Sequence, residues 1–141
     1  MAMTMHVDIV SAEQAIFSGL AEMLIAPATL GEVGVMPGHA PLLTTLGPGE
    51  LRVKVPDSDE LSFYVSGGLL EIQPHVVTVL SDTAERADHL DEAAAKESMA
   101  KAERALAEHA AGIDEAAARA EIAAAAAQLR AIRRLRRQTG R

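Results

Sequence analysis

Residues 51–65 read LRVKVPDSDELSFYV, and this stretch decides the fold of the first half of the chain. Apolar and polar residues alternate in Leu51–Val55 and again in Leu61–Val65. Alternation with a period of two is typical of a strand with one buried face. The Pro-Asp-Ser-Asp sequence at residues 56–59 is typical of a turn. The stretch therefore predicts a β-hairpin of two half-buried strands.

The sequence around this hairpin carries further strand and turn signals. Apolar or β-branched runs predict strands at Met5–Val10, Met23–Ala26, Leu69–Ile72 and Val76–Leu80. All six prolines lie within residues 1–74, and eight of the ten glycines lie within residues 1–68. Many short strands separated by turns predict a β-sandwich or flattened barrel.

The second half of the chain is dominated by alanine and predicts two helices. From Asp88 onward, 19 of 54 residues are alanine, which has the highest helix propensity. Apolar stripes at helical spacing run along Met99, Ala102, Leu106 and Ala110, and along Ile122, Ala125, Leu129 and Ile132. Asp91 can cap the first helix, Gly112 can end it, and Asp114 can cap the second. We expect a β domain at residues 1–87 and an antiparallel helical hairpin at residues 88–141.

The alanine content also predicts how firmly the hairpin is held. A buried alanine methyl contributes about 0.8 kcal/mol at most, whereas a buried Leu or Ile contributes about 1.5–3 kcal/mol. The helices should therefore form readily but dock weakly. This favours a module that changes position without unfolding, and a small stable hairpin is the alternative.

Charge is distributed unevenly along the chain. Residues 1–87 have a net charge of −8 and residues 88–121 a net charge of −5. Residues 122–141 hold six arginines and no acidic residue. On a helix, one face would carry Arg130, Arg133, Arg134, Arg137 and Arg141, whereas Arg136 would lie in line with the apolar stripe.

The arginine cluster has three interpretations. It could complement the negative end of the helix dipole, although one or two arginines would suffice for that. It could bind an acidic protein, which we favour. It could bind nucleic acid, but the rest of the chain is acidic and no aromatic residue lies near the arginines for base stacking.

Several functional classes receive little support from the sequence. The chain has no cysteine, which excludes disulfides and cysteine metal sites. It lacks the features of a signal peptide, and its apolar runs are too short to cross a bilayer, so we expect a soluble, cytoplasmic protein that can still dock onto a membrane complex. The five histidines are scattered, which makes His39 a turn or contact residue rather than a general base. An enzyme using His39 is the weakest hypothesis.

The glycine-rich stretches also lack catalytic signatures. Residues 31–43, GEVGVMPGHAPLL, match neither a Walker phosphate loop nor the glycine spacing of a dinucleotide-binding turn. Ser66, Gly67 and Gly68 lack the flanking glycines of a nucleophile elbow, so we interpret them as a bend at the end of a strand.

Five stretches match a known family in order and spacing. They are SAEQAIFSG (Ser11–Gly19), GEVGVMPGHAPLL (Gly31–Leu43), VSGGLLEIQP (Val65–Pro74), VTVLSDTA (Val77–Ala84) and LDEAAA (Leu90–Ala95). The chain closely resembles the epsilon subunits of bacterial rotary proton-driven ATP synthases. The resemblance implies a flattened β-sandwich of about ten strands followed by a helical hairpin.

The resemblance also implies which surfaces contact other subunits. In the family, the turn-rich segment belongs to the face of the sandwich that sits on the membrane rotor ring of c subunits. Glu32 matches an acidic position that contacts the ring, and His39 lies in the same segment. We expect both residues to be exposed together on a turn-rich end of the sandwich. Ser11 lies in a stretch that resembles the edge contacting the gamma subunit.

Regulation through the hairpin is a further implication of the resemblance. In the family, the hairpin folds against the sandwich or extends beside gamma toward the catalytic alpha and beta subunits. In the extended state it resists ATP hydrolysis, and basic residues of the last helix meet an acidic loop of beta. Here these positions correspond to Arg130, Arg133, Arg134 and Arg137.

Some family members bind ATP through an LDxxRA motif at the start of the first helix. This chain keeps Leu90, Asp91 and Ala95 but has Ala94 where the motif has arginine. Alanine cannot replace the forked, permanently charged guanidinium that suits a phosphate. We therefore expect no cofactor and no tight binding of ATP.

Together these features imply a non-catalytic central-stalk subunit that couples proton flow to ATP synthesis and inhibits ATP hydrolysis. Its expected location is the cytoplasmic face of the bacterial plasma membrane, as a peripheral part of the complex without direct membrane insertion. No nucleic acid is expected as a partner. A nucleic-acid-binding adaptor with an arginine-rich helix remains the alternative.

Overall fold

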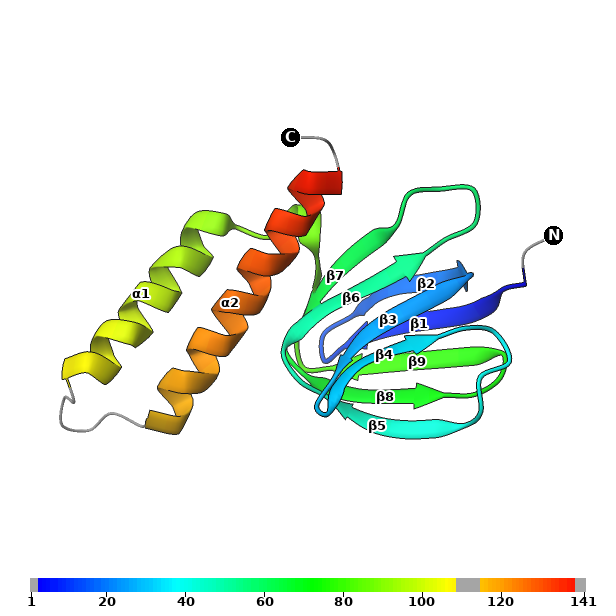
Figure 1. The fold of residues 1–141 in the computed structure, drawn as a ribbon, viewed down its shortest axis with the longest axis horizontal. Helices are drawn as coiled ribbons and strands as arrows, with labels where there is room; N and C mark the ends of the chain where they lie inside the picture. Colours follow the sequence, from blue (N-terminus) through cyan, green and yellow to red (C-terminus); the bar gives the residue numbers. More distant parts are fainter. Residues whose placement is uncertain (1–2, 109–114, 139–141) are drawn as a thin grey trace.

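The computed structural model describes residues 3–108 and 115–138. Ten strands come first in the chain, followed by a short 3-10 helix and two long helices (Figure 1). The strands are β1 (Met5–Ser11), β2 (Ala15–Ala21), β3 (Met23–Ala28), β4 (Gly31–Val35), β5 (Leu42–Leu46), β6 (Gly49–Lys54), β7 (Leu61–Val65), β8 (Gly68–Ile72), β9 (Val76–Ser81) and β10 (Ala84–Arg86). The helices are η1 (Ala87–His89), α1 (Glu92–Glu108) and α2 (Glu115–Gln138).

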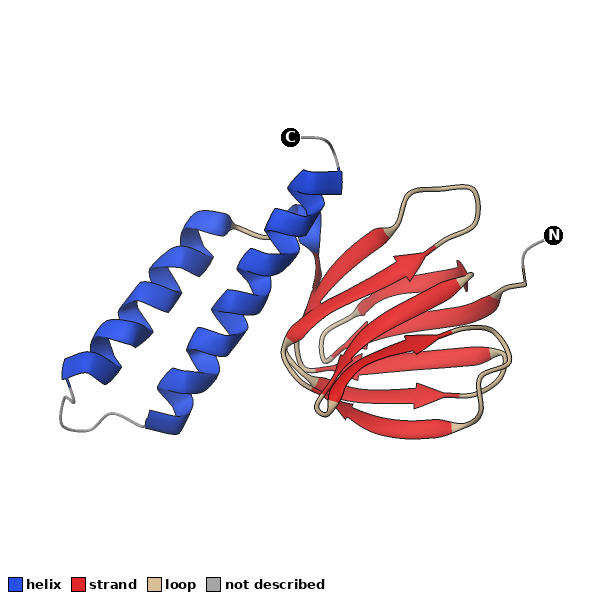
Figure 2. Ribbon diagram, viewed as in Figure 1, coloured by secondary structure: helices blue, strands red, loops and turns tan. Residues whose placement is uncertain are grey.

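The strands form one continuous sheet that folds over on itself into a β-sandwich (Figure 2). Their order is β10-β7-β6-β3-β5-β8-β9-β1-β2, with β4 paired to β3 outside this path. All strand pairs are antiparallel except β1 and β9, which are parallel. The predicted sandwich followed by a helical hairpin is therefore confirmed.

The hairpin predicted at residues 51–65 is present as β6 and β7. Gly49 pairs with Val65 and Val53 with Leu61, so the two strands are in register around the intervening turn. Asp57 in this turn has φ 55°, a left-handed conformation that aspartate tolerates better than most residues.

The core is built from the inward face of each strand, as the alternation predicts. Leu51 and Val53 on β6 are fully buried in the same core as Val7 and Ile9 on β1. Phe63 on β7 is the largest fully buried side chain, and its ring lies 5.7 Å from the ring of Phe17. Leu, Ile and Val supply most of the other buried side chains, in agreement with the low aromatic content.

Two features of the strands differ from the sequence analysis. The turn-rich segment 31–43 contains a strand that the sequence did not indicate, because Gly31–Val35 pairs with β3 as strand β4. In addition, β7 is not half-buried: Ser62 and Tyr64 on its outer face are buried as well. The cause of the second difference is α2, which lies against β6 and β7.

The two helices form an antiparallel hairpin that lies beside the sandwich (Figure 1). α2 lies between α1 and the sandwich and contacts β6, β7 and η1. Asp91 caps α1 as predicted, since the amide of Ala94 donates to Asp91 Oδ1 at 3.1 Å. Gly112 and Asp114, predicted to end the first helix and to cap the second, lie outside the described residues.

Small side chains dominate the buried surfaces of the hairpin. Of the eight buried apolar residues on α1 and α2, six are alanine, and the other two are Leu129 and Ile132. The hairpin is folded against the sandwich. Weak docking stays a prediction, but these small contacts are what it requires.

Candidate functional site

Glu32 lies on β4, opposite Pro27 of β3. Its side chain is 58% exposed, and its Oε1 lies 3.4 Å from Nη2 of Arg52. Together with Arg130, Arg134 and Arg137 of α2, it lines a hollow of about 230 Å³ between α2 and the sandwich. Glu32 is thus available to a partner, but at the end of the sandwich that the arginine-rich helix reaches.

His39 lies at the other end of the sandwich. The amide of Gly38 donates to the carbonyl of Pro74 at 2.8 Å, which ties this turn to the one between β8 and β9. His39 is half-buried, and its Nδ1 lies 2.7 Å from the carbonyl oxygen of Ala40. The prediction that Glu32 and His39 are exposed together at one end is therefore wrong. Strand β4 separates them, since an extended chain rises about 3.3 Å per residue.

Ser11 ends β1 and organises the turn that leads to β2. Its Oγ accepts from the amides of Glu13 and Gln14 at 3.3 and 3.2 Å and donates to the carbonyl of Gln14 at 3.1 Å. Its hydroxyl therefore shapes the turn instead of serving as a nucleophile.

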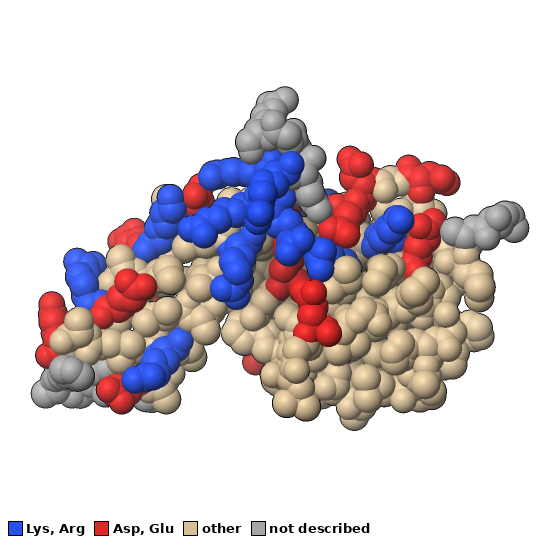
Figure 3. All heavy atoms as spheres, viewed as in Figure 1, with Lys and Arg blue, Asp and Glu red and all other residues tan. Residues whose placement is uncertain are grey.

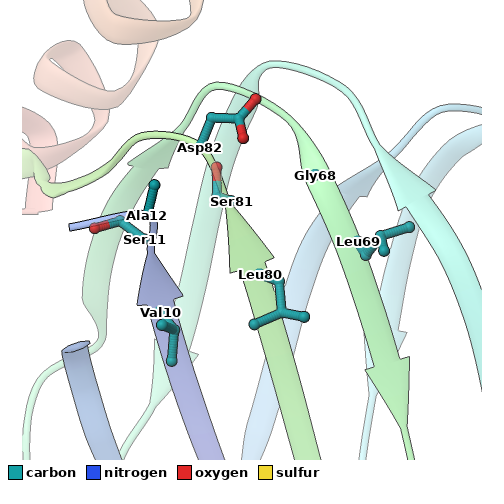
Figure 4. A pocket seen from close by; sticks show the side chains of 8 residues that line it. All are labelled: Val10, Ser11, Ala12, Gly68, Leu69, Leu80, Ser81 and Asp82. Atoms are coloured by element: carbon teal, nitrogen blue, oxygen red, sulfur yellow. The ribbon is translucent and has the colours of Figure 1, made fainter. Parts of the chain in front are cut away.

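Beside Ser11 lies a shallow apolar hollow of about 310 Å³ (Figure 4). Val10 on β1 pairs with Leu80 on β9, which in turn pairs with Leu69 on β8, so the three form a row across the outer face of the sheet. Leu80 is 48% exposed and Leu69 is 41% exposed. Exposed aliphatic side chains in one continuous row are typical of a surface that another protein covers.

Gly68 lines this hollow at the start of β8 and follows Gly67, and the two glycines have φ of 137° and 126°. The bend predicted at this strand end is therefore confirmed. A Cβ on Gly68 would lie 2.0 Å from the carbonyl oxygen of Leu80. Only glycine lets β8 and β9 approach this closely.

The predicted arginine face lies along α2, where basic side chains gather and meet acidic residues of the sandwich (Figure 3). Arg130, Arg133 and Arg137 are exposed, whereas Arg134 is half-buried. Nε of Arg134 lies 2.6 Å from Oε1 of Glu50 on β6. The face is therefore partly engaged within the chain itself.

Sequence reasoning missed Glu50. Its side chain is 11% exposed, and its second oxygen accepts from Oγ of Ser62 at 2.5 Å. Burial raises the pKa of the Glu50 carboxyl, and the nearby Glu60 raises it further. Ser62, Arg134 and Arg52 act in the opposite direction but do not cancel the effect of burial on this pKa.

The segment that corresponds to the ATP-binding motif of some family members, at the start of α1, makes contacts within the chain. Ala94 is exposed and Ala95 is buried, while Asp91 serves as the cap of α1. Glu92 forms ion pairs with Arg136 of α2 and with Lys96, and these contacts lower the pKa of its carboxyl, with Arg136 having the larger effect. Arg136 therefore joins the two helices instead of lying on the free arginine face.

Residues 3–108 and 115–138 contain neither a cluster of metal ligands nor a membrane-spanning helix. In that part of the chain, no group of three or more His, Asp and Glu side chains converges as a metal site would require. None of the three described helices is both long enough and apolar enough to span a membrane.

Comparisons with known proteins give a consistent result. Residues 4–87 match the family model for the ATP synthase delta/epsilon chain, beta-sandwich domain. An ATP synthase epsilon chain of Nitrosococcus oceani is 61% identical over 99% of this chain and 100% of its own length. One of Thioalkalivibrio sulfidiphilus is also 61% identical, over 99% of each chain.

Solved structures share the fold at lower sequence identity. A chain in a Euglena gracilis mitochondrial ATP synthase structure, of OSCP, F1 and c-ring, superposes with a TM-score of 0.72 at 19% identity, covering 86% of this chain and 76% of that one. A chain in a Tetrahymena thermophila ATP synthase central stalk and c-ring structure gives 0.60 at 12% identity, covering 92% and 97%. None of these comparisons supports the nucleic-acid alternative. The chain therefore belongs to the family of ATP synthase delta/epsilon chains.

Proposed function

We propose that this chain is the epsilon subunit of a bacterial rotary proton-translocating ATP synthase. In this role it is a non-catalytic rotor subunit of the central stalk, which links the membrane ring of c subunits to gamma and so helps couple proton flow to ATP synthesis. The observation that carries the proposal is the 61% identity to an ATP synthase epsilon chain over nearly the whole of both chains.

The outer face of β1, β9 and β8 is the surface that we assign to gamma. The row Val10–Leu80–Leu69 lies next to Ser11, the residue whose stretch resembles the family's gamma-contacting edge. Covering this apolar row would contribute roughly 25 cal/mol for each Å² removed from water. Ser11 itself would contribute by holding the neighbouring turn in shape.

We assign contact with the c-ring to the exposed Glu32. Its carboxylate is available at the surface because the side chain is 58% exposed and its contact with Arg52, at 3.4 Å, is long. His39 lies at the opposite end, next to Gly38, whose amide donates to the carbonyl of Pro74, so it does not share that contact surface in this conformation. We therefore place only Glu32 at the ring.

The hairpin is the proposed regulatory element. When it extends, Arg130, Arg133, Arg134 and Arg137 would meet an acidic loop of beta, which hinders rotation in the direction of ATP hydrolysis. The high helix propensity of alanine supports this movement, because the helices need little help from the sandwich to persist. No tight ATP site is proposed, since Ala94 offers no cation for a phosphate.

The proposed location is the cytoplasmic face of the bacterial plasma membrane, in peripheral association through the other subunits. A direct test is affinity capture with the tagged full-length chain from membranes of a bacterium that expresses it. Recovery of the gamma and c subunits is expected. Recovery of RNA that survives moderate salt, without gamma or c, would overturn the proposal in favour of the nucleic-acid adaptor.

A further inference from the structure

Glu50 occupies an unusual position at the interface between β6 and α2. Its side chain is only 11% exposed, yet it places a carboxyl group against α2, a helix whose buried residues are mostly alanine. Each carboxylate oxygen has one partner: Nε of Arg134 lies 2.6 Å from Oε1, and Ser62 donates to Oε2 at 2.5 Å. Arg134 is the partner that comes from the hairpin.

The environment of Glu50 does not fully offset the cost of burying its charge. Burial raises the pKa of this carboxyl despite the opposing effects of Ser62, Arg134 and Arg52. Glu60 adds repulsion, and Glu32 lines the neighbouring hollow together with Arg130, Arg134 and Arg137. Buried ion pairs commonly behave in this way, because desolvation can exceed the attraction between the charges.

Arg134 and Glu50 therefore make unequal contributions to docking. Without Arg134, the docked hairpin would cover a carboxylate that had lost its closest cation, which is strongly unfavourable. Without the charge on Glu50, Arg134 would remain 41% exposed and could be hydrated where it is. α2 itself contributes only small apolar side chains here, since Ala127 and Ala131 bury only methyl groups.

We propose that Glu50 is a release element, a carboxylate that allows the hairpin to dock only while Arg134 neutralises it. This inference rests on the proposed function, in which an acidic segment of a partner attracts the same arginine. When the partner binds Arg134, Glu50 loses its closest cation and becomes more stable in solvent than under the helix. α2 therefore dissociates from the sandwich. Capture of one arginine is thereby converted into release of the whole hairpin.

The isolated full-length chain can test this, because it contains no cysteine and accepts two labels cleanly. Ser58→Cys in the β6–β7 turn and Ala100→Cys on α1 are exposed positions without charge. Fluorescence energy transfer between dyes at these positions reports whether the hairpin is docked. Arg134→Gln, Glu50→Gln and the double variant are compared in this labelled background, with Arg119→Gln, at an exposed position of α2, as the matched control.

Arg134→Gln should lower the ratio of docked to undocked hairpin by about tenfold or more. Glu50→Gln should leave this ratio unchanged or raise it, and the double variant should recover docking that Arg134→Gln loses. Arg119→Gln should dock as the unsubstituted chain does. A loss of docking in Glu50→Gln as large as in Arg134→Gln would overturn the proposal. The two residues would then form an ion pair that stabilises docking through both partners equally. Unchanged docking in Arg134→Gln would also overturn it.

The effect of pH provides a second test with a defined sign. A carboxyl whose pKa is raised on docking binds a proton more readily in the docked state, so docking strengthens as pH falls toward the ordinary value of 4.5. On acidification from neutral pH, the ratio of docked to undocked hairpin should therefore increase more in the unsubstituted chain than in Glu50→Gln. The opposite difference between the two chains would contradict the proposal.

In a third test, a polyglutamate peptide represents the acidic partner. Added to the isolated chain, it should reduce docking in the unsubstituted protein and have a smaller effect on Glu50→Gln. Equal effects on the two chains would overturn the release mechanism. All of these measurements use the isolated chain, so their failure is distinguishable from failure to assemble with gamma and c or to restrain hydrolysis.

Discussion

Gly68 shows how a single residue determines the geometry of the proposed gamma-binding face. Its φ of 137° lies in a region that side-chain-bearing residues avoid, and an added Cβ would lie 2.0 Å from the Leu80 carbonyl oxygen. Gly68→Ala should therefore reduce the free energy of unfolding by about 2 kcal/mol or more, from backbone strain and steric overlap. Urea denaturation of the isolated chain measures this.

Gly47→Ala is the matched control, since a Cβ there meets nothing within 4 Å. We expect its unfolding free energy to stay within about 1 kcal/mol of the unsubstituted chain. If Gly68→Ala were equally well tolerated, the close approach of β8 to β9 would not depend on glycine.

Ala94 is the residue that decides the expected response to ATP. Isothermal titration calorimetry of the isolated chain should detect no tight ATP binding, because no arginine occupies this position at the start of α1. Ala94→Arg should gain measurable binding, as the exposed site can accommodate a long side chain. Micromolar binding by the unsubstituted chain would mean that other arginines hold the phosphates.

Glu32 gives the residue-scale test of the c-ring contact. Glu32→Lys should weaken capture of c subunits while the thermal unfolding of the isolated chain changes little, because exposed ion pairs contribute only about 0–1 kcal/mol. His39→Ala is a useful comparison, since His39 lies at the other end of the sandwich. Unchanged capture by Glu32→Lys would remove this residue from the proposed interface.

At the scale of elements, the sequence predicted best where a single local pattern dominates. The period of two in residues 51–65 predicted β6 and β7, and Asp91 predicted the start of α1. The segment 31–43 was harder, because its glycines and prolines obscured the five residues of β4. That strand separates Glu32 from His39, which explains why the predicted shared surface was wrong.

The contact between α2 and the sandwich could not be predicted from the sequence. Nothing local in β7 shows that Ser62 and Tyr64 will be covered by a helix that comes much later in the chain. The arginine cluster was visible, but its pairing with Glu50 depends on the docked position of α2. Tertiary packing, rather than propensity, determines these features.

The apolar row on β1, β9 and β8 gives a prediction at this scale. Leu80→Asp should weaken capture of gamma by about tenfold or more. The aspartate would lose its hydration in the middle of the interface without gaining a partner, and burying an unpaired charge is costly. Leu30→Asp provides the control, because Leu30 is fully exposed in the turn after β3. Equal capture by the two variants would place gamma on another surface.

At the scale of the whole molecule, the chain combines a firm sandwich with a hairpin held by small and charged contacts. The sandwich has a continuous core of Leu, Ile, Val and Phe, whereas six of the eight buried apolar residues of the hairpin are alanine. This difference fits a division of labour in which the sandwich keeps the subunit in the rotor and the hairpin regulates. Removing the end of α2 should therefore affect regulation and spare assembly.

The most direct test is the rate of ATP hydrolysis by the assembled synthase with a chain that lacks residues 130–141. We predict a severalfold faster hydrolysis, with assembly and ATP synthesis retained, because the truncated helix can no longer grip an acidic partner. Arg133→Gln, Arg134→Gln and Arg137→Gln combined should reproduce most of the increase, since glutamine nearly matches arginine in helix propensity. If neither the truncation nor the triple variant changes hydrolysis in a fully assembled complex, the hairpin does not regulate the enzyme and the account is contradicted.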